Sequence, residues 1–229
     1  MNANELIGTH DVLMITLDTL RYDVAKQAME QGATPHLQSW VPGGRWEERH
    51  SPGNFTYAAH QAFFAGFLPT PAQPGRHPRL FATAFPGSET TTPETCVFDS
   101  PDIVSGLAER GYHTICIGGV GFFNKLSPLG RVLPNLFRES YWSEEMGVTS
   151  PHSTEVQVRQ ALACLGDLPS DQRAFLFLNI SALHQPNCLF SPGATEDSPA
   201  TQAAALAYVD HHLPLLFQAM RERAPVLCV

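Results

Sequence analysis

Basic charge is scarce in this sequence. In 229 residues, 14 Lys and Arg stand against 22 Asp and Glu, which gives a formal net charge of -8. The basic residues form no cluster or stripe, and affinity for a nucleic-acid backbone depends on clustered cations. No apolar run approaches the roughly 18 residues that a membrane-spanning helix requires. We therefore expect neither nucleic acid nor a membrane as a partner.

Paired cysteines and a secretion signal are also absent. The five cysteines are scattered and form no C-x-x-C pair. The first ten residues are polar, contain no basic segment and lead directly into an apolar run, which is unlike a signal peptide. Scattered thiols are typical of proteins in a reducing compartment. These features predict a cytoplasmic protein.

The sequence does contain a regular alternation of apolar runs and helical stretches. Hydrophobic residues make up 43% of the chain and charged residues 16%, which fits an ordered globule. The expected strands are residues 11–17, 45–50, 80–85, 113–117, 174–180 and 225–229, and the expected helices are residues 22–31, 57–67, 102–110, 153–165 and 201–223, with a short helix after Thr34. This alternation predicts an α/β fold, a three-layer α/β/α sandwich with a mostly parallel central sheet.

The domain prediction covers residues 1–229 as one unit. A stretch rich in Pro, Thr and Gly at about residues 70–95 predicts an irregular surface excursion. The final apolar run, residues 225–229, is typical of a buried strand, and a strand at the end of a domain leaves backbone groups unpaired. We therefore expect a domain that is incomplete at its C-terminus. Its exposed last strand allows pairing into a homo-oligomer.

Asp18 is the first candidate for chemistry, because active sites of parallel sheets lie beyond the carboxyl ends of the strands. It directly follows the apolar run at residues 11–17. A carboxylate at this place needs a partner, since burial of an unpaired charge is costly. The partner is either a divalent metal ion or Arg21, and a helix N-cap is the plain alternative.

Thr56 is the second candidate. The stretch NFTYAAH, residues 54–60, predicts a loop that leads into a helix with Thr56 at its start. A hydroxyl there faces the positive end of the helix dipole, which attracts an anionic phosphoryl or sulfuryl group. A nearby metal would lower the pKa of the hydroxyl and activate it as a nucleophile. The alternative is a plain N-cap. Asn54 and His60 are candidates for substrate binding, although His60 fits a core position equally well.

Histidines later in the chain provide a candidate acid and a metal-like cluster. His184 follows the apolar run at residues 174–180 and is a candidate general acid, because histidine titrates near neutral pH. A loop histidine bonded to the backbone is the alternative. Asp210, His211 and His212 are adjacent on an expected helix, where neighbouring side chains point about 100° apart. We therefore interpret this cluster as structural.

Several of these segments resemble one family. The run ITLDTLRYD around Asp18, with TPHL at residues 34–37, resembles the opening strand and first helix of sulfatases and their relatives in the alkaline phosphatase superfamily. The T-x-x-x-H run at Thr56, followed by Gly66 and Pro69, resembles the nucleophile helix of type I phosphodiesterases and nucleotide pyrophosphatases. The stretch around His184 resembles the family's PHxP element. The resemblance implies an alkaline phosphatase-like core.

The resemblance also implies chemistry. Asp18 and Thr56 would be ligands of a divalent metal ion (zinc, manganese or calcium), with Thr56 as the nucleophile and His184 assisting the leaving group. The chain lacks the Cys or Ser that becomes formylglycine in sulfatases, and Gly119 stands where the family has a substrate-gripping Lys. The D-H-G motif that completes the family's metal site is also missing.

The resemblance therefore implies a metal-dependent hydrolase of phosphate, phosphonate or sulfate esters. Its partner would be a small anionic ester, and we expect phosphate and phosphonate esters ahead of sulfate esters. With so few metal ligands, we expect this chain to have little activity. A catalytically inactive binding or assembly module is the main alternative. A Rossmann-type nucleotide binder is a third, but no phosphate-binding glycine motif follows the first strand.

Overall fold

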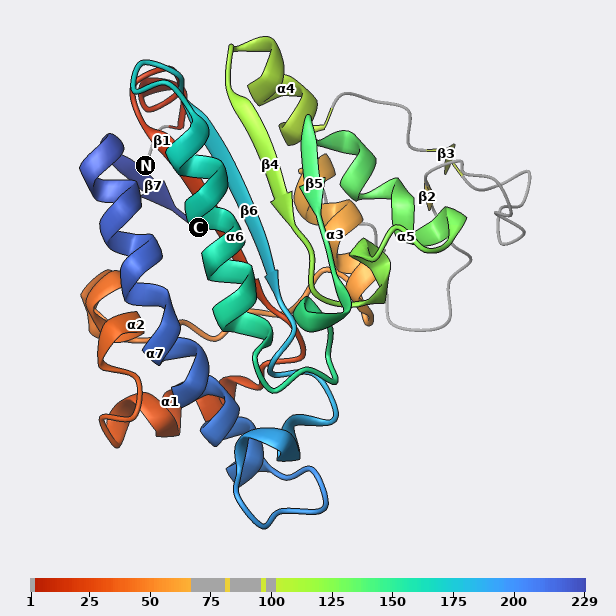
Figure 1. Cartoon of the computed structure of the whole chain (residues 1–229), viewed down its shortest axis with the longest axis vertical. Helices are drawn as coiled ribbons and strands as arrows, with labels where there is room; N and C mark the ends of the chain where they lie inside the picture. The colour runs from red at the N-terminus through yellow and green to blue at the C-terminus, as the bar shows by residue number, and fades with distance from the viewer. Residues whose placement is uncertain (1–2, 67–80, 83–95, 98–101) are drawn as a thin grey trace.

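The centre of the molecule is a parallel sheet (Figure 1). The computed structural model describes residues 3–66, 81–82, 96–97 and 102–229. Five strands pair in the order β5-β4-β6-β1-β7, and every pair is parallel. The strands are β1 (Asp11–Leu17), β4 (His113–Ile117), β5 (Glu139–Tyr141), β6 (Ala174–Ile180) and β7 (Val226–Cys228). Two short strands, β2 (Phe81–Ala82) and β3 (Cys96–Val97), pair only with each other.

Helices cover both faces of the sheet. They are α1 (Tyr22–Glu30), α2 (Pro35–Trp40), α3 (Thr56–Ala65), α4 (Ile103–Glu109), α5 (Pro128–Val132), α6 (Ser153–Asp167) and α7 (Pro199–Arg223). One apolar core joins one face of the sheet to α1, α2, α6 and α7, and a second core joins the other face to α3 and α4. Figure 1 shows α6 and α7 side by side in front of the sheet. The predicted three-layer α/β/α sandwich is confirmed.

The two cores explain why β6 reads as one continuous apolar run. All seven of its residues are buried. Leu176 and Leu178 face one core, whereas Phe175 and Phe177 face the other. A central strand of a parallel sheet is covered on both sides, so its sequence need not alternate.

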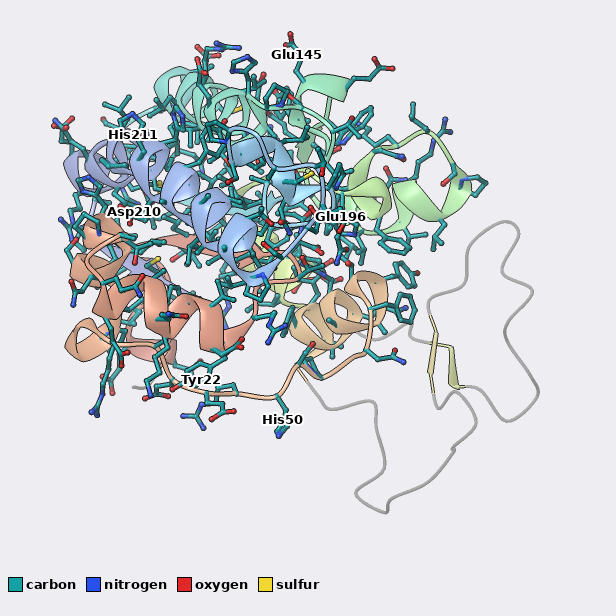
Figure 2. All side chains as sticks on the ribbon, turned by 90° about the horizontal axis from the view of Figure 1, so that it is seen from below. Tyr22, His50, Glu145, Glu196, Asp210 and His211 are labelled. Atoms are coloured by element: carbon teal, nitrogen blue, oxygen red, sulfur yellow. The ribbon has the colours of Figure 1, made fainter. Side chains whose placement is uncertain are left out.

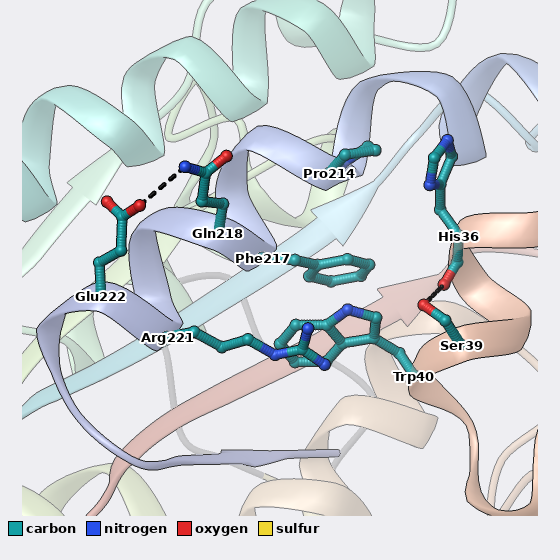
Figure 3. A pocket seen from close by; sticks show the side chains of 8 residues that line it. All are labelled: His36, Ser39, Trp40, Pro214, Phe217, Gln218, Arg221 and Glu222. Atoms are coloured by element: carbon teal, nitrogen blue, oxygen red, sulfur yellow. Dashed lines mark hydrogen bonds between the residues drawn. The ribbon is translucent and has the colours of Figure 1, made fainter.

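The end of α7 is packed against α2 through stacked side chains. The Trp40 ring stacks on Phe217 with ring centroids 4.0 Å apart, and the Arg221 guanidinium lies 4.1 Å from the Trp40 centroid (Figure 3). Further along α7, the buried Asp210 carboxylate accepts hydrogen bonds from the backbone N–H groups of His36 and Leu37, at 3.3 and 2.6 Å. Asp210 thus caps the N-terminus of α2, which confirms the structural interpretation for this member of its cluster.

Most expected elements are present, and one is wrong. The strands predicted at residues 11–17, 113–117 and 174–180 have the observed bounds. Residues 45–50 form no strand; four of them, residues 47–50, are exposed charged or histidine side chains with nothing apolar to bury against a sheet. The structure has β5, which was not predicted. Most of the expected excursion at about residues 70–95 lies outside the described residues.

No helix in the described ranges is both long enough and apolar enough to cross a membrane. Strand β7 lies at one edge of the sheet. Pairing of two copies through this strand and a cytoplasmic location stay predictions.

Candidate active site

Asp18 and Thr56 meet beyond the carboxyl end of β1. Asp18, directly after the strand, is only 6% exposed. The Thr56 hydroxyl, at the start of α3, donates to its carboxylate, with Oγ1 lying 3.3 Å from Oδ1 and 3.2 Å from Oδ2. Arg21 instead forms a surface ion pair with Asp23 at 2.6 Å, so it is not the partner of Asp18. The fold therefore brings together the two residues that the sequence motifs singled out.

The backbone around Asp18 is fixed from two sides. The N–H of Asp18 donates to the carbonyl of Ile180 at 3.2 Å, which extends the pairing of β1 with β6 by one residue. Thr19 then adopts a left-handed conformation with φ of 60°, which is unfavourable for a β-branched residue. Its hydroxyl donates to the Leu183 carbonyl at 3.0 Å, and the Gln202 amide donates to the Thr19 carbonyl at 3.1 Å. These bonds hold the turn and with it the carboxylate.

Asn179 links Asp18 to the interior of the sheet. This fully buried residue lies opposite Thr16 in the β1–β6 register. Its side-chain amide nitrogen donates to Asp18 Oδ2 and to Thr16 Oγ1, both at 3.1 Å. Its side-chain oxygen accepts from the backbone N–H of Val120 at 2.9 Å. The Val120 N–H therefore fixes which way the amide points, and both amide hydrogens are used.

His60 closes the same network from α3. Its Nδ1 lies 2.6 Å from the Thr56 carbonyl and its Nε2 lies 3.0 Å from Thr16 Oγ1. Because a carbonyl only accepts, Nδ1 carries the proton, and the Thr16 hydroxyl then donates to Nε2. Burial lowers the pKa of His60, against a smaller opposing effect of its hydrogen bond to the Thr56 carbonyl. The ring is therefore neutral near pH 7.

This geometry bears on the expected role of His60. The side chain is 3% exposed, and its ring packs edge-on against Phe64, Phe123 and Phe177. Both ring nitrogens are engaged within the protein, so neither is free for a substrate in this arrangement. Of the two readings of the sequence, the structure favours the core position, in which His60 connects Thr56 to Thr16.

Close packing behind Asn179 requires glycine at position 119. A Cβ added to Gly119 would lie 2.1 Å from the Asn179 carbonyl oxygen and 2.9 Å from the Cβ of Ser181. The side-chain amide of Gln157 donates to the same Asn179 carbonyl at 2.7 Å and to the Gly118 carbonyl at 3.0 Å. The glycines after β4 thus allow this segment to lie against β6, which accounts for them without a bound ligand.

Thr56 is the first residue of α3, and the preceding residue gives no side-chain cap. The N–H groups of the first turn and the helix dipole therefore face the region of Asp18 with positive partial charge. In the described ranges, no Lys or Arg side chain forms a hydrogen bond or ion pair with Asp18 or Thr56. An anion at this place would be attracted mainly by the helix terminus.

The other candidate residues lie near this region without joining the network. His184 is in the loop after β6, and its Nδ1 lies 2.8 Å from the Gln185 carbonyl. The adjacent Leu183 carbonyl accepts from Thr19, which ties this loop to the Asp18 turn. Asn54 is exposed in the loop before α3. The roles of His184 as a general acid and Asn54 as a substrate ligand stay predictions.

The donor set fits only one side of a metal site. Asp18 and Thr56 present oxygen atoms to each other, and Asn179 points N–H groups rather than its oxygen at Asp18. The described part of the chain contains no group of three or more His, Cys, Asp or Glu side chains that could hold a metal ion. Zinc in proteins usually takes roughly four ligands. The described residues therefore do not complete a metal site.

Sequence reasoning missed Thr16 and Asn179 as parts of the site. Each is a polar residue near the end of an otherwise apolar strand, and they occupy opposite positions once β1 and β6 are paired in parallel. That pairing is the signal from which they can be found, because two buried polar side chains in register need each other as partners.

Comparison with known proteins identifies the fold. No family model and no curated protein matches the sequence. The chain is similar over 96% of its length to the C-terminal periplasmic domain of EcEptC from Escherichia coli in complex with Zn, with a TM-score of 0.61 and 10% identity. It is similar over 94% of its length to the lipoteichoic acid synthase LtaP from Listeria monocytogenes, with a TM-score of 0.55 and 14% identity.

The chain covers 62% of the first of these chains and 53% of the second. At such low sequence identity, the likeness shows the fold and not the activity. The chain has the alkaline phosphatase-like α/β fold that its sequence motifs imply.

Proposed function

We propose that this chain is the nucleophile-bearing part of a metal-dependent hydrolase of phosphate, phosphonate or sulfate esters. The observation that carries the proposal is the bond of 3.2–3.3 Å between the Thr56 hydroxyl and the Asp18 carboxylate. This pair lies at the carboxyl end of a parallel sheet, where such folds place their ligands. A hydroxyl at the start of α3 is also well placed to meet an anionic ester.

The proposed reaction begins with attack by Thr56. Its Oγ1 forms a bond to phosphorus or sulfur in line with the departing alcohol oxygen, and water then releases the product from Thr56. The hydroxyl already directs its proton at Asp18, while His184 protonates the leaving group. Divalent metal, held in part by Asp18 and Thr56, would lower the pKa of the hydroxyl and stabilise negative charge. Asn54 contacts the ester oxygens in this proposal.

The substrate is a small anionic ester. Phosphate and phosphonate esters rank ahead of sulfate esters because the chain lacks a formylglycine precursor and has Gly119 in place of the family's Lys. One similar structure is named a synthase, so transfer to an alcohol instead of water belongs in the same assay. We expect low activity from this chain, since Asp18 and Thr56 are two donor residues among those that the structure describes, where zinc needs roughly four ligands.

Variants of Thr56 test the proposal. The wild-type chain would be assayed with added zinc, manganese or calcium on p-nitrophenyl phosphate, bis-p-nitrophenyl phosphate and p-nitrophenyl sulfate. Thr56→Ala should abolish turnover with an unchanged circular dichroism spectrum, and Thr56→Ser should retain part of it. Mass spectrometry should find the phosphoryl group on Thr56 in acid-quenched wild type. Thr9→Ala, a surface variant, is the matched control. Measurable turnover at equal rates in Thr56→Ala and wild type would refute the role of Thr56 as the nucleophile.

A catalytically inactive binding or assembly module is the second candidate. The observation in its favour is the incomplete donor set in the described ranges. Absence of turnover on every ester and with every metal, together with retained binding of an ester, would favour the module.

A further inference from the structure

An exposed aromatic residue directly precedes the proposed nucleophile in the chain. Phe55 immediately precedes Thr56 and is 43% exposed. A large apolar side chain on the surface needs no explanation when it stands alone. Phe55 does not stand alone, because it continues a row of aromatic rings that begins in the core.

The row consists of Phe55, Phe122 and Tyr57, which we call the aromatic wall. The Phe122 ring lies 6.0 Å from the ring of Phe55 and 5.7 Å from the ring of Tyr57, in tilted arrangements typical of aromatic pairs. Phe55 and Tyr57 flank Thr56 in the sequence, so Phe122 packs against both neighbours of the nucleophile. Tyr57 is 1% exposed and anchors the row, while Phe55 forms its open end.

Two separate elements contribute residues to the aromatic wall, and packing against the core fixes their positions. Phe55 and Tyr57 come from the start of α3, whereas Phe122 comes from a 3-10 helix (Gly121–Phe123) after β4. The next residue, Phe123, is 1% exposed and packs against Phe177 with ring centroids 5.5 Å apart. Phe122 is therefore fixed by a buried neighbour. A rigid apolar surface binds a flat apolar group at little cost in conformational entropy.

The partners of the basic side chains also favour an uncharged group beside the reacting centre. In the described ranges, no Lys or Arg side chain forms a hydrogen bond or ion pair with Thr56: Arg21 pairs with Asp23, and Lys125 donates to the carbonyl and hydroxyl oxygens of Ser140. The exposed residue before Thr56, Phe55, is apolar.

We infer that the aromatic wall binds an aryl or similarly flat apolar group of the substrate, next to the phosphorus or sulfur that Thr56 attacks. The inference rests on the proposed function of Thr56 and adds a substrate class, aryl esters in preference to small polar alkyl esters. Phe55 is the residue that makes this contact, and Phe122 supports it from behind.

The test compares an aryl with an alkyl group on one anionic centre. Binding of phenylphosphonate and methylphosphonate would be measured by ligand-observed NMR, and turnover of their p-nitrophenyl monoesters, which share one leaving group, would be measured with added zinc. Wild type should prefer each phenyl compound by roughly threefold to tenfold, the range expected for one added aromatic pair. Phe55→Ala should remove the preference without weakening methylphosphonate binding, and Phe55→Leu should keep part of it.

Leu215→Ala is the matched control, because Leu215 is an apolar side chain on α7 that is 64% exposed. Equal affinity of wild type for the two phosphonates, or a preference that survives in Phe55→Ala, would overturn the inference and leave the role of Thr56 standing. Failure of every probe to bind or react would instead refute the proposed function, and the aryl site with it.

Discussion

The side-chain amide of Asn179 donates to the Asp18 carboxylate and to the Thr16 hydroxyl, each at 3.1 Å. Thr16 in turn meets His60 Nε2 at 3.0 Å, and His60 Nδ1 meets the Thr56 carbonyl. A closed path of hydrogen bonds thus runs from the carboxylate through the sheet to the helix that carries Thr56. This path sets the separation of Asp18 from Thr56. Substitution of its members therefore tests how the site is held.

Asn179→Asp should destabilise the fold in a pH-dependent way. The variant keeps the shape of the side chain but places a second carboxylate against Asp18, and two carboxylates at one site raise the pKa of one of them. A group with a raised folded-state pKa contributes stability below its unfolded pKa and loses it as pH rises through the folded value. The deficit relative to wild type should be about 2 kcal/mol or more at neutral pH. It should shrink as pH falls toward about 4.

Urea denaturation at several pH values measures this effect. Asn135→Asp, which adds the same charge at an exposed position, is the control. A deficit for Asn179→Asp that is the same at acid and neutral pH would show that lost geometry, and not the carboxylate pair, is responsible.

His60 should make stability depend on pH above the range of the carboxylates. Burial lowers its folded-state pKa below the ordinary value of 6.5, so the unfolded chain binds the proton more readily. Its contribution to stability is complete above that ordinary pKa and declines as pH falls toward the lowered value, by at most about 1.4 kcal/mol per pH unit. His60→Leu should be less stable than wild type at about pH 8, and the difference should narrow toward about pH 5.

The comparison needs a control for loss of one histidine. His50→Gln serves, because the His50 side chain points away from the body of the protein (Figure 2). The difference in free energy of unfolding between wild type and His60→Leu could instead stay constant over this pH range. Burial of neutral His60 would then not be the source of its contribution to stability.

Gly119→Ala should weaken the fold and the site together. The added Cβ meets the Asn179 carbonyl oxygen at 2.1 Å, which is backbone and cannot move aside cheaply. Overpacking of this kind typically costs about 1–3 kcal/mol. Gly166→Ala is the matched control, since a Cβ on this residue of α6 meets nothing within 4 Å and alanine is the better helix former. Thermal unfolding should show a lower Tm for Gly119→Ala and an equal or higher Tm for Gly166→Ala.

An element of the fold could be predicted from the sequence when its own residues carry the pattern that identifies it. The strands ending at Leu17, Ile117 and Ile180 are apolar runs whose bounds the sequence alone predicts. Residues 139–141 have no such pattern, and β5 forms there because β4 provides an edge to pair with. Residues 45–50 contain one β-forming residue, Trp46, and they pair with no strand.

The residues of the candidate site likewise divide into those that the local sequence identifies and those that only the folded structure identifies. Asp18 and Thr56 stand out because Asp18 directly follows an apolar run, Thr56 begins a helical stretch, and each matches a motif. Thr16 and Asn179 become meaningful only in the paired register of two strands, 163 residues apart. The α2 cap is equally non-local: Thr34 occupies the N-cap position but makes no capping bond, and Asp210 on α7 supplies the carboxylate instead.

Metal titration tests the donor set directly. Asp18 and Thr56 offer two oxygen donors in the described ranges, so zinc, manganese and calcium should each bind this chain weakly and without a tight first equivalent. Isothermal titration calorimetry should give a Kd well above the protein concentration, and Asp18→Asn should weaken even this binding, whereas Asp167→Asn on the surface should not. One tight equivalent of metal on the wild-type chain would mean that donors outside the described residues join Asp18. In that case the expectation of low activity falls as well, because a complete ligand set is what an activated Thr56 requires.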